Sequence, residues 1–221
     1  MTDLSEPASQ LDAADAFAEL ARARLLQTPP SGDDDLDAPP DRGDHDLNPD
    51  LEPGYMATRR RRAAVLVPIV SRAQPSVLLT RRADHLPSHA GQIAFPGGKV
   101  EKGDDGPLQA ALRETREEIG LDRNEVTPLG YLDLYETSTG FRIVPVVGLV
   151  RPGFDLLIDR NEVAAVFEVP LSFLMSPANH QRHSRNWQGK RRSFYAMPYG
   201  EHYIWGATAG MLRALYDRLY R

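Results

Sequence analysis

The stretch "FPGGKVEKGDDGPLQAALRETREEIGL", residues 95–121, joins a pair of glycines to a predicted helix. Pro107 is tolerated in the first turn of a helix, Asp105 can cap that turn, and Gly120 is a typical C-terminal stop. The sequence therefore predicts a helix from about Gly106 to Ile119. At roughly 100° per residue, one face of this helix is suited to the core. That face consists of Leu108, Ala111, Leu112, Thr115 and Ile119.

The other face of the predicted helix carries Glu114, Glu117 and Glu118. Like charges at i and i+4 cost roughly a few tenths of a kcal/mol, and Arg113 offsets only part of that cost. A solvated acidic face is the alternative interpretation, but it would carry lysines among the glutamates, and the sequence has none there. Carboxylates that converge on one point suit a hard divalent cation such as Mg²⁺ or Mn²⁺. The helix therefore indicates a metal site.

The residues before the helix complete a known motif. Gly97 and Gly98 allow the backbone to come close to a ligand. Together with "RETREEIGL", residues 113–121, they resemble the Nudix box, whose pattern is G-x5-E-x7-R-E-U-x-E-E-x-G-U with U apolar. Asp105 stands at the first acidic position, one residue late, and Thr115 occupies an apolar position. We expect Asp105 to reach Arg113 and to fix the loop.

A second stretch, "LLTRRADHLPSHAGQIAFPGG" at residues 78–98, resembles the signature found upstream of the box in the coenzyme A diphosphatase branch of Nudix hydrolases. The resemblance extends from Arg60 to the C-terminus. It implies an α/β/α sandwich with a mixed sheet, and hydrolysis of coenzyme A to 3′,5′-ADP and 4′-phosphopantetheine. The alternatives are a Nudix enzyme for ADP-ribose, a dinucleotide or a nucleoside triphosphate, and a non-catalytic nucleotide-binding module.

The resemblance also implies roles for individual residues. Mg²⁺ or Mn²⁺ is expected on Glu114 and Glu118, with Glu117 sharing and the Gly97 carbonyl completing the shell. For the general base, Glu114 and Glu117 are placed ahead of Glu162, and Arg113 is expected to orient the catalytic loop. The candidates for substrate binding are Arg81, His89, Gln92 and Gly98.

Two segments precede the resembling region. "LDAADAFAELARARLL", residues 11–26, is an amphipathic helix that either packs on the domain or stands beside it. Residues 27–57 are rich in Pro, Gly and Asp, which predicts a solvated, disordered linker, with an acidic interaction tail as the alternative. The predicted organisation is therefore a helix at 1–26, a linker at 27–57 and a Nudix domain at 58–221.

The remaining pattern is strand-rich. We expect strands at 63–70, 75–82 and 162–170, a long hairpin over 126–150, a further hairpin over 191–206, and a closing helix at 207–220. This order favours an α/β or α+β sandwich over regular βαβ winding. Within the second hairpin, residues 203–205 are expected to lie in the core, with an adenine platform as the alternative.

Composition limits the possible partners. The chain has 221 residues and a formal net charge of -5, which predicts no affinity for nucleic acid. No apolar run reaches the roughly 20 residues that a membrane span requires, and the first residues do not resemble a signal peptide. We therefore expect a cytoplasmic protein that does not bind nucleic acid or a membrane. Its substrate, as the resemblance implies, is a small-molecule nucleotide of the coenzyme A class. The sequence contains no cysteine, which excludes thiolate catalysis.

Overall fold

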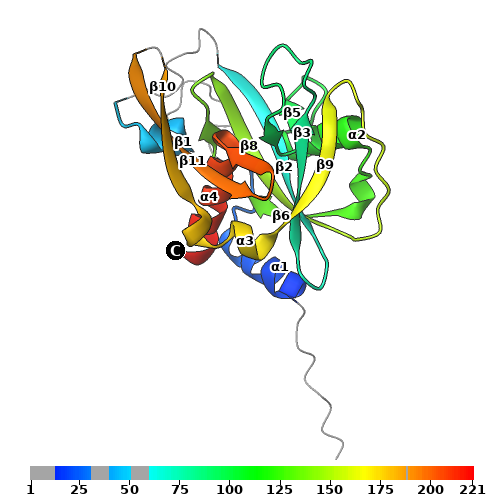
Figure 1. The fold of residues 1–221 in the computed structure, drawn as a ribbon. Coiled ribbons are helices and arrows are strands. Elements are labelled where there is room, and N and C mark those ends of the chain that lie inside the picture. Colours follow the sequence, from blue (N-terminus) through cyan, green and yellow to red (C-terminus); the bar gives the residue numbers. More distant parts are fainter. Residues whose placement is uncertain (1–12, 31–39, 51–59, 188) are drawn as a thin grey trace, which may run out of the picture.

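The computed structural model describes residues 13–30, 40–50, 60–187 and 189–221. Its centre is a nine-stranded mixed sheet with helices on both faces, as the sequence predicts (Figure 1). Strands β2 (Arg61–Val70) and β8 (Phe141–Val150) run parallel through the middle of this sheet. The path continues through β3 (Ser76–Arg82) to β4 (Ile93–Ala94) on one side, and through β7 (Tyr135–Glu136) to β1 (Arg42–Gly43) on the other.

Three further strands join this sheet beside its main path. They are β5 (Gly97–Lys99) on β2, β6 (Val126–Tyr131) on β8, and β9 (Val163–Pro170) on β3, all antiparallel. Short helical segments connect the strands: η1 (Asp44–Leu47), η2 (Arg123–Glu125), α3 (Leu171–Leu174) and η3 (Pro177–Asn179).

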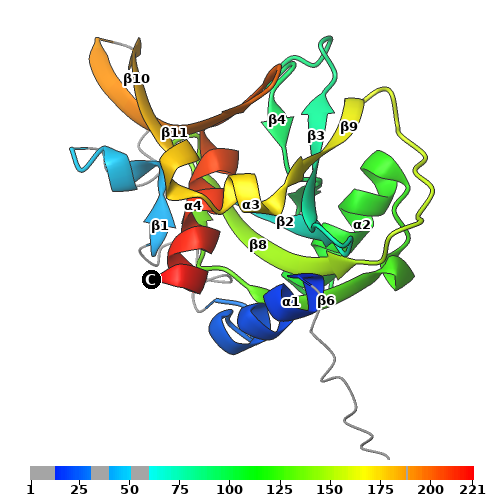
Figure 2. The ribbon, with the colours of Figure 1, turned by 60° about the horizontal axis from the view of Figure 1, so that its bottom comes forward.

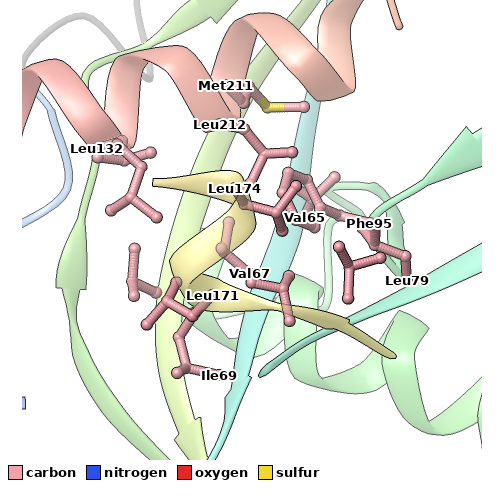
Figure 3. Close-up of a cluster of buried hydrophobic side chains, with 14 of the residues drawn as sticks. Val65, Val67, Ile69, Leu79, Phe95, Leu132, Leu171, Leu174, Met211 and Leu212 are labelled. Carbon is pink, nitrogen blue, oxygen red and sulfur yellow. The ribbon is translucent and has the colours of Figure 1, made fainter. Parts of the chain in front are cut away.

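Strand β2 supplies both hydrophobic cores because its side chains alternate between the two faces of the sheet. Val65, Val67 and Ile69 lie in the larger core (Figure 3). Leu66 and Val70 lie in the smaller core on the opposite face. Helix α2 (Pro107–Ile119) closes the smaller core, whereas α1 (Ala13–Arg24) and α4 (Ala207–Tyr220) close the larger one (Figure 2). The result is three layers, helix, sheet and helix.

The first helix packs on the domain and is part of its core. Phe17, Ala18 and Ala21 are almost fully buried and belong to the larger core cluster. Just after the helix, Leu26 pairs with Tyr131 at the end of β6. Of the two arrangements that the sequence allows for this helix, the described residues show the docked one. Residues 1–12 of the predicted N-terminal segment lie outside the described residues.

Part of the segment predicted as a linker is also docked. Within 27–57, residues 40–50 contribute β1, which pairs in parallel with β7, and then the short helix η1. Asn48 is only 5% exposed, and its side-chain amide makes two hydrogen bonds with the backbone of Ser193, at 2.9 and 2.8 Å. The prediction of a solvated linker is therefore wrong for residues 40–50, because they are held by backbone pairing and one buried amide. Residues 31–39 and 51–57 lie outside the described residues.

A second, three-stranded antiparallel sheet lies near the C-terminal helix (Figure 2). It consists of β10 (Gln181–Trp187), β11 (Lys190–Tyr199) and β12 (His202–Trp205). The predicted hairpin of β11 and β12 is present, whereas β10 was not predicted. Of the residues 203–205 that were expected in the core, Ile204 is fully buried, but Tyr203 is 42% exposed. No helix among the described residues is long and apolar enough to cross a membrane.

Candidate active site

Helix α2 has the predicted bounds, but its start is built differently. It begins after Gly106, whose φ of 96° is a conformation that glycine adopts easily, and it ends at Gly120, with φ of 72°. Asp105 makes no side-chain capping bond; instead its backbone N–H donates to the side chain of Gln109 at 2.5 Å. The prediction of Asp105 as the cap is therefore wrong.

The acidic partner of Arg113 is Asp104, not Asp105. The guanidinium binds Asp104 with two hydrogen bonds, from Nε at 3.0 Å and from Nη2 at 2.9 Å. These bonds lower the pKa of the Asp104 carboxyl and raise the pKa of Arg113. Five residues separate Gly98 from Asp104, so the extra residue of the motif lies after the acid and not before it.

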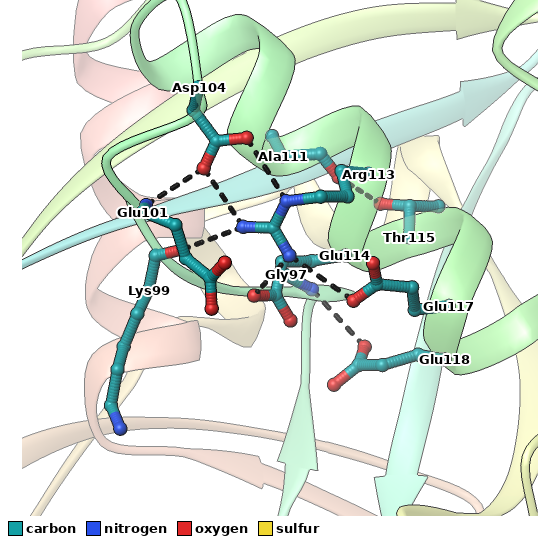
Figure 4. Close-up of polar contacts among 10 residues, drawn as sticks. All are labelled: Gly97, Lys99, Glu101, Asp104, Ala111, Arg113, Glu114, Thr115, Glu117 and Glu118. Carbon is teal, nitrogen blue, oxygen red and sulfur yellow. Dashed lines mark hydrogen bonds and ion pairs between the residues drawn. The ribbon is translucent and has the colours of Figure 1, made fainter.

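Arg113 also connects the loop to the glutamates of the helix (Figure 4). Its Nη1 donates to Glu114 at 2.9 Å and to Glu117 at 3.1 Å, and its Nη2 donates to the Lys99 carbonyl at 3.1 Å. One guanidinium therefore holds the loop, strand β5 and two carboxylates in a fixed arrangement. The orienting role that the resemblance implies for Arg113 stays a prediction, and its expected partner Asp105 is replaced by Asp104.

The glycine pair lets the backbone of β5 lie directly against a carboxylate. A Cβ atom placed on Gly98 would lie 2.4 Å from Glu114 Oε2. One placed on Gly97, where φ is 147°, would lie 2.4 Å from the Ala64 carbonyl in β2. Gly97 therefore requires glycine, whereas a side chain at Gly98 would displace the carboxylate of Glu114. Burial raises the pKa of Glu114, although Arg113 opposes the shift.

Glu118 is the buried member of the glutamate cluster. It is 4% exposed, and the Gly97 N–H donates to its Oε2 at 3.2 Å. Burial raises the pKa of Glu118 to about 7, the Gly97 N–H opposes the shift, and the charge of Glu162 adds to it. The sequence predicts Glu118 on the helix face opposite the core with the other two glutamates, but Glu118 is buried on the side of the helix that faces β5.

The three glutamates differ in what they could offer a metal ion. Glu114 and Glu118 point toward Gly97 (Figure 4), and the charge of Glu162 raises the pKa of both carboxyls. Glu117, whose side chain is 57% exposed, lies further out and contacts Arg113. As they stand, no three His, Asp or Glu side chains of the described residues are gathered closely enough to hold a metal. Mutually repelling oxygen ligands in a partly buried place nonetheless fit a hard divalent cation, with Glu114 and Glu118 as its holders.

The comparison with protein families decides the identity of this site. Residues 60–188 match the family model described as NUDIX domain. The chain belongs to the Nudix family. A Yersinia pestis protein named "Uncharacterized Nudix hydrolase NudL" is 41% identical over 161 residues, which is 73% of this chain and 81% of that protein. This chain is a Nudix hydrolase, and Nudix hydrolases generally use divalent ions such as Mg²⁺ or Mn²⁺.

Solved structures give weaker matches. DR0079 from Deinococcus radiodurans has a TM-score of 0.48 and 16% identity, over 79% of this chain and 88% of that one. An Ap4A hydrolase from C. elegans, solved as a binary complex, has a TM-score of 0.43 and 24% identity, over 51% of this chain and 81% of that one.

Of the two arginines that end β3, the one nearer to the Nudix glutamates is Arg82. Its charge lowers the pKa of Glu118, and its Nε is buried without a hydrogen-bond partner among the described residues. Arg81, the predicted phosphate ligand, pairs with Asp84 at 3.2 Å, and its side chain is 40% exposed. Side-chain alternation along a strand places Arg81 and Arg82 on opposite faces, but the sequence does not indicate which of the two faces the site.

The signature loop between β3 and β4 leads away from the Nudix helix to a pocket. His89 lies in this loop with a φ of 58°, and its Nδ1 lies 2.9 Å from Gln92 Oε1. The backbone of Gln92 in turn accepts from the Arg82 N–H at 2.9 Å. His89 lines a pocket with a volume of about 270 Å³, and none of the Nudix glutamates is part of its lining. The predicted residues His89 and Gln92 therefore lie together. His89 lines this pocket, whereas Glu114 does not.

Proposed function

We propose that this Nudix hydrolase cleaves the diphosphate bond of coenzyme A or its derivatives, giving 3′,5′-ADP and 4′-phosphopantetheine. The observation that carries the choice of substrate is the stretch at residues 78–98, which resembles the coenzyme A diphosphatase signature. Two features of this loop support a binding role: the contact between His89 and Gln92, and the position of His89 in the pocket wall.

In the proposed reaction, a water oxygen forms a bond to one phosphorus, and the bridging oxygen leaves with the electron pair on the other phosphate. A bound divalent cation would neutralise the charge of the diphosphate and lower the pKa of water in the site. Glu114 and Glu118 would hold that cation. Arg113 would keep Glu114 and the loop in place through its bonds to Asp104.

The proton of the attacking water requires a base. The resemblance favours Glu114 and Glu117 over Glu162 as the general base. The contacts favour a different order, because Glu117 is bound to Arg113 and Glu114 is assigned to the cation. Glu162 is exposed, and its charge acts on both Glu114 and Glu118. We therefore place Glu162 ahead of Glu117 as the base.

A substrate panel tests the proposal. With Mg²⁺ or Mn²⁺ present, coenzyme A, acyl-coenzyme A, dephospho-coenzyme A, ADP-ribose, a diadenosine polyphosphate and a nucleoside triphosphate are compared by kcat/KM. Coenzyme A or an acyl derivative is expected to give the highest value, with 3′,5′-ADP and 4′-phosphopantetheine as the products separated by chromatography. If another compound is cleaved tenfold more efficiently, which corresponds to about 1.4 kcal/mol of transition-state binding, the proposed substrate is wrong although the hydrolase assignment stands.

A further inference from the structure

The loop between β8 and β9, residues 151–162, carries Glu162 and lies against the end of the Nudix helix. Three of its apolar side chains pack against the smaller core, which α2 closes: Phe154, Leu156 and Ile158. Leu157 lies directly on Gly120, the residue that ends α2. A Cβ atom on Gly120, whose φ is 72°, would lie 2.6 Å from the Leu157 backbone nitrogen. The glycine that ends the helix therefore lets the loop approach it closely.

Two backbone hydrogen bonds join this loop to the last turn of α2. The Leu157 N–H donates to the Ile119 carbonyl at 2.9 Å, and the Asp159 N–H donates to the Glu118 carbonyl at 2.9 Å. The last carbonyls of a helix have no partner within the helix, so an N–H from a neighbouring segment is favoured there. The loop is therefore held in register with α2, and Asp159 is bonded to the backbone of a residue that we assign to the cation.

Asp159 also begins the turn that ends at Glu162. Its backbone carbonyl accepts from the Glu162 N–H at 3.1 Å and from the Val163 N–H at 2.9 Å. Its side-chain Oδ1 accepts from the backbone N–H and from the side-chain amide of Asn161, both at 2.9 Å. Aspartate often closes a turn in this way, by binding the backbone two residues further on. Asp159 therefore joins the backbone of Glu118 to that of Glu162 and fixes the turn with its own side chain.

The position of the Glu162 carboxylate depends on this turn. Glu162 is exposed, and within the described part of the chain no hydrogen bond holds its side chain. Its backbone, in contrast, is held from both sides, because its carbonyl also accepts from the Ala83 N–H at 2.8 Å. The charge of Glu162 nevertheless acts on both Glu114 and Glu118. The backbone of the turn therefore keeps this carboxylate beside the glutamates of the helix.

A general base requires such a support. It must lie within hydrogen-bond reach of the water that it deprotonates, and a displacement of about 1 Å can cost roughly 100-fold in rate. A loop attached only at its two ends would not hold a carboxylate that closely. A turn that is bonded to the Glu118 backbone, and closed by an aspartate side chain, fixes the separation between the base and the helix.

We infer that Asp159 is a positioning residue for the reaction: its turn holds the carboxylate of Glu162 beside Glu118, within reach of the water that attacks phosphorus. The inference deepens the proposed function and rests on it for the role of Glu162 as the base. It does not depend on coenzyme A as the substrate, because every candidate compound contains a diphosphate.

Steady-state kinetics of the full chain with Mg²⁺ test the inference, with the diphosphate compound that wild-type protein cleaves most efficiently as the substrate. Asp159→Ala is expected to lower kcat roughly tenfold and to change KM by less than about twofold, because it displaces a catalytic group and not the substrate. Asp159→Asn should restore most of the rate, since an amide oxygen can also accept from Asn161. In a Glu162→Gln background, Asp159→Ala should lower kcat by less than about twofold, because its effect acts through Glu162.

Amide hydrogen exchange gives a readout that does not depend on turnover. The N–H groups of Glu162 and Val163, which donate to the Asp159 carbonyl, should exchange faster in Asp159→Ala than in wild-type protein and in Asp159→Asn. Asp155→Ala is the matched control, because Asp155 is an exposed aspartate of the same loop. It should change neither kcat nor the exchange of these two groups.

The inference is overturned if Asp159→Ala keeps more than about half of the wild-type kcat, or if Asp155→Ala or Asp159→Asn has the same effect as Asp159→Ala. It is also overturned if the loss is as large in the Glu162→Gln background, which would leave the proposed function intact. Full activity of Glu162→Gln would refute the base and its positioning together. Coupling of Asp159 to Glu162 in a protein that cleaves another diphosphate compound, but not coenzyme A, would refute the proposed substrate and support the inference.

Discussion

The two ends of this molecule handle charge in opposite ways. At the Nudix helix, the carboxylates of Glu114, Glu118 and Glu162 repel one another in a partly buried place. At the C-terminal sheet, Arg185 and Arg192 stand directly opposite each other on one face. A bound divalent cation would relieve the repulsion among the glutamates. The two arginines, in contrast, lie in a sheet whose strands are held together by backbone pairing.

The sharpest test of this comparison is the removal of one buried charge from the helix. Glu118→Gln is expected to reduce kcat by about 10² to 10⁴-fold in saturating metal, a loss of the size typical of a single catalytic group. The fold should be retained, because an amide is less costly than a carboxylate in a site that is 4% exposed. Steady-state kinetics and thermal unfolding on the same preparation measure both effects.

Glu125→Gln is the control for this variant, because Glu125 lies outside the site and pairs with Arg151 at 2.9 Å. A Glu118→Gln protein that keeps more than a tenth of the wild-type rate would contradict the role of Glu118. In that case the glutamate cluster would lose its assignment as the metal site.

The catalytic end was the more predictable of the two from the sequence. The short β-branched run at residues 63–70 predicts the central strand, and the spacing of Glu114, Glu117 and Glu118 predicts the helix and the glutamate cluster. The burial of Glu118 was not predictable, because it depends on how closely β5 approaches the helix at Gly97. Nor was the choice of Asp104 over Asp105, because neighbouring aspartates in a loop differ only in the turn that the backbone takes.

The C-terminal sheet and the docked segment at residues 40–50 were largely hidden in the sequence. Strand β10 reads "QRHSRNW", which shows no alternation of apolar and polar residues. It is held in place by backbone pairing with β11, and backbone pairing does not require apolar side chains. Residues 40–50 look like a linker for a similar reason: they dock through backbone pairing and through Asn48, which leave no trace in hydrophobicity. Patterns of apolar residues report burial of side chains and not hydrogen bonding of the backbone.

A second prediction separates stability from catalysis on the α1 side of the sheet. Phe17→Ala is expected to lower the free energy of unfolding by about 3 to 5 kcal/mol, because it leaves a cavity at a residue that is 5% exposed. The melting temperature should fall by roughly 10 °C. At temperatures where the variant is folded, kcat should be unchanged, since α1 packs against β6 and α4, on the face of the sheet opposite the glutamate helix.

Glu19→Ala is the matched control, because Glu19 is an exposed residue of the same helix. If Phe17→Ala unfolded no more readily than Glu19→Ala, the docking of α1 against the sheet would be refuted. A large loss of kcat in the folded variant would show instead that the two faces of the sheet are coupled.

The smallest expected effect concerns the loop that carries the catalytic end. Arg113→Ala should lower kcat more than it raises KM, since Arg113 positions Glu114 and the loop. Asp104→Ala should act through the same contact, because two hydrogen bonds of 3.0 and 2.9 Å join the pair. A double-mutant cycle on kcat/KM is therefore expected to give a coupling energy of about 1 to 3 kcal/mol.

The same cycle with Asp105→Ala is the control and should be additive to within about 0.5 kcal/mol, because the structure gives Asp105 no contact with Arg113 among the described residues. Coupling to Asp105 with additivity at Asp104 would move the acid of the Nudix loop by one residue, and the extra residue of the motif would then precede the acid.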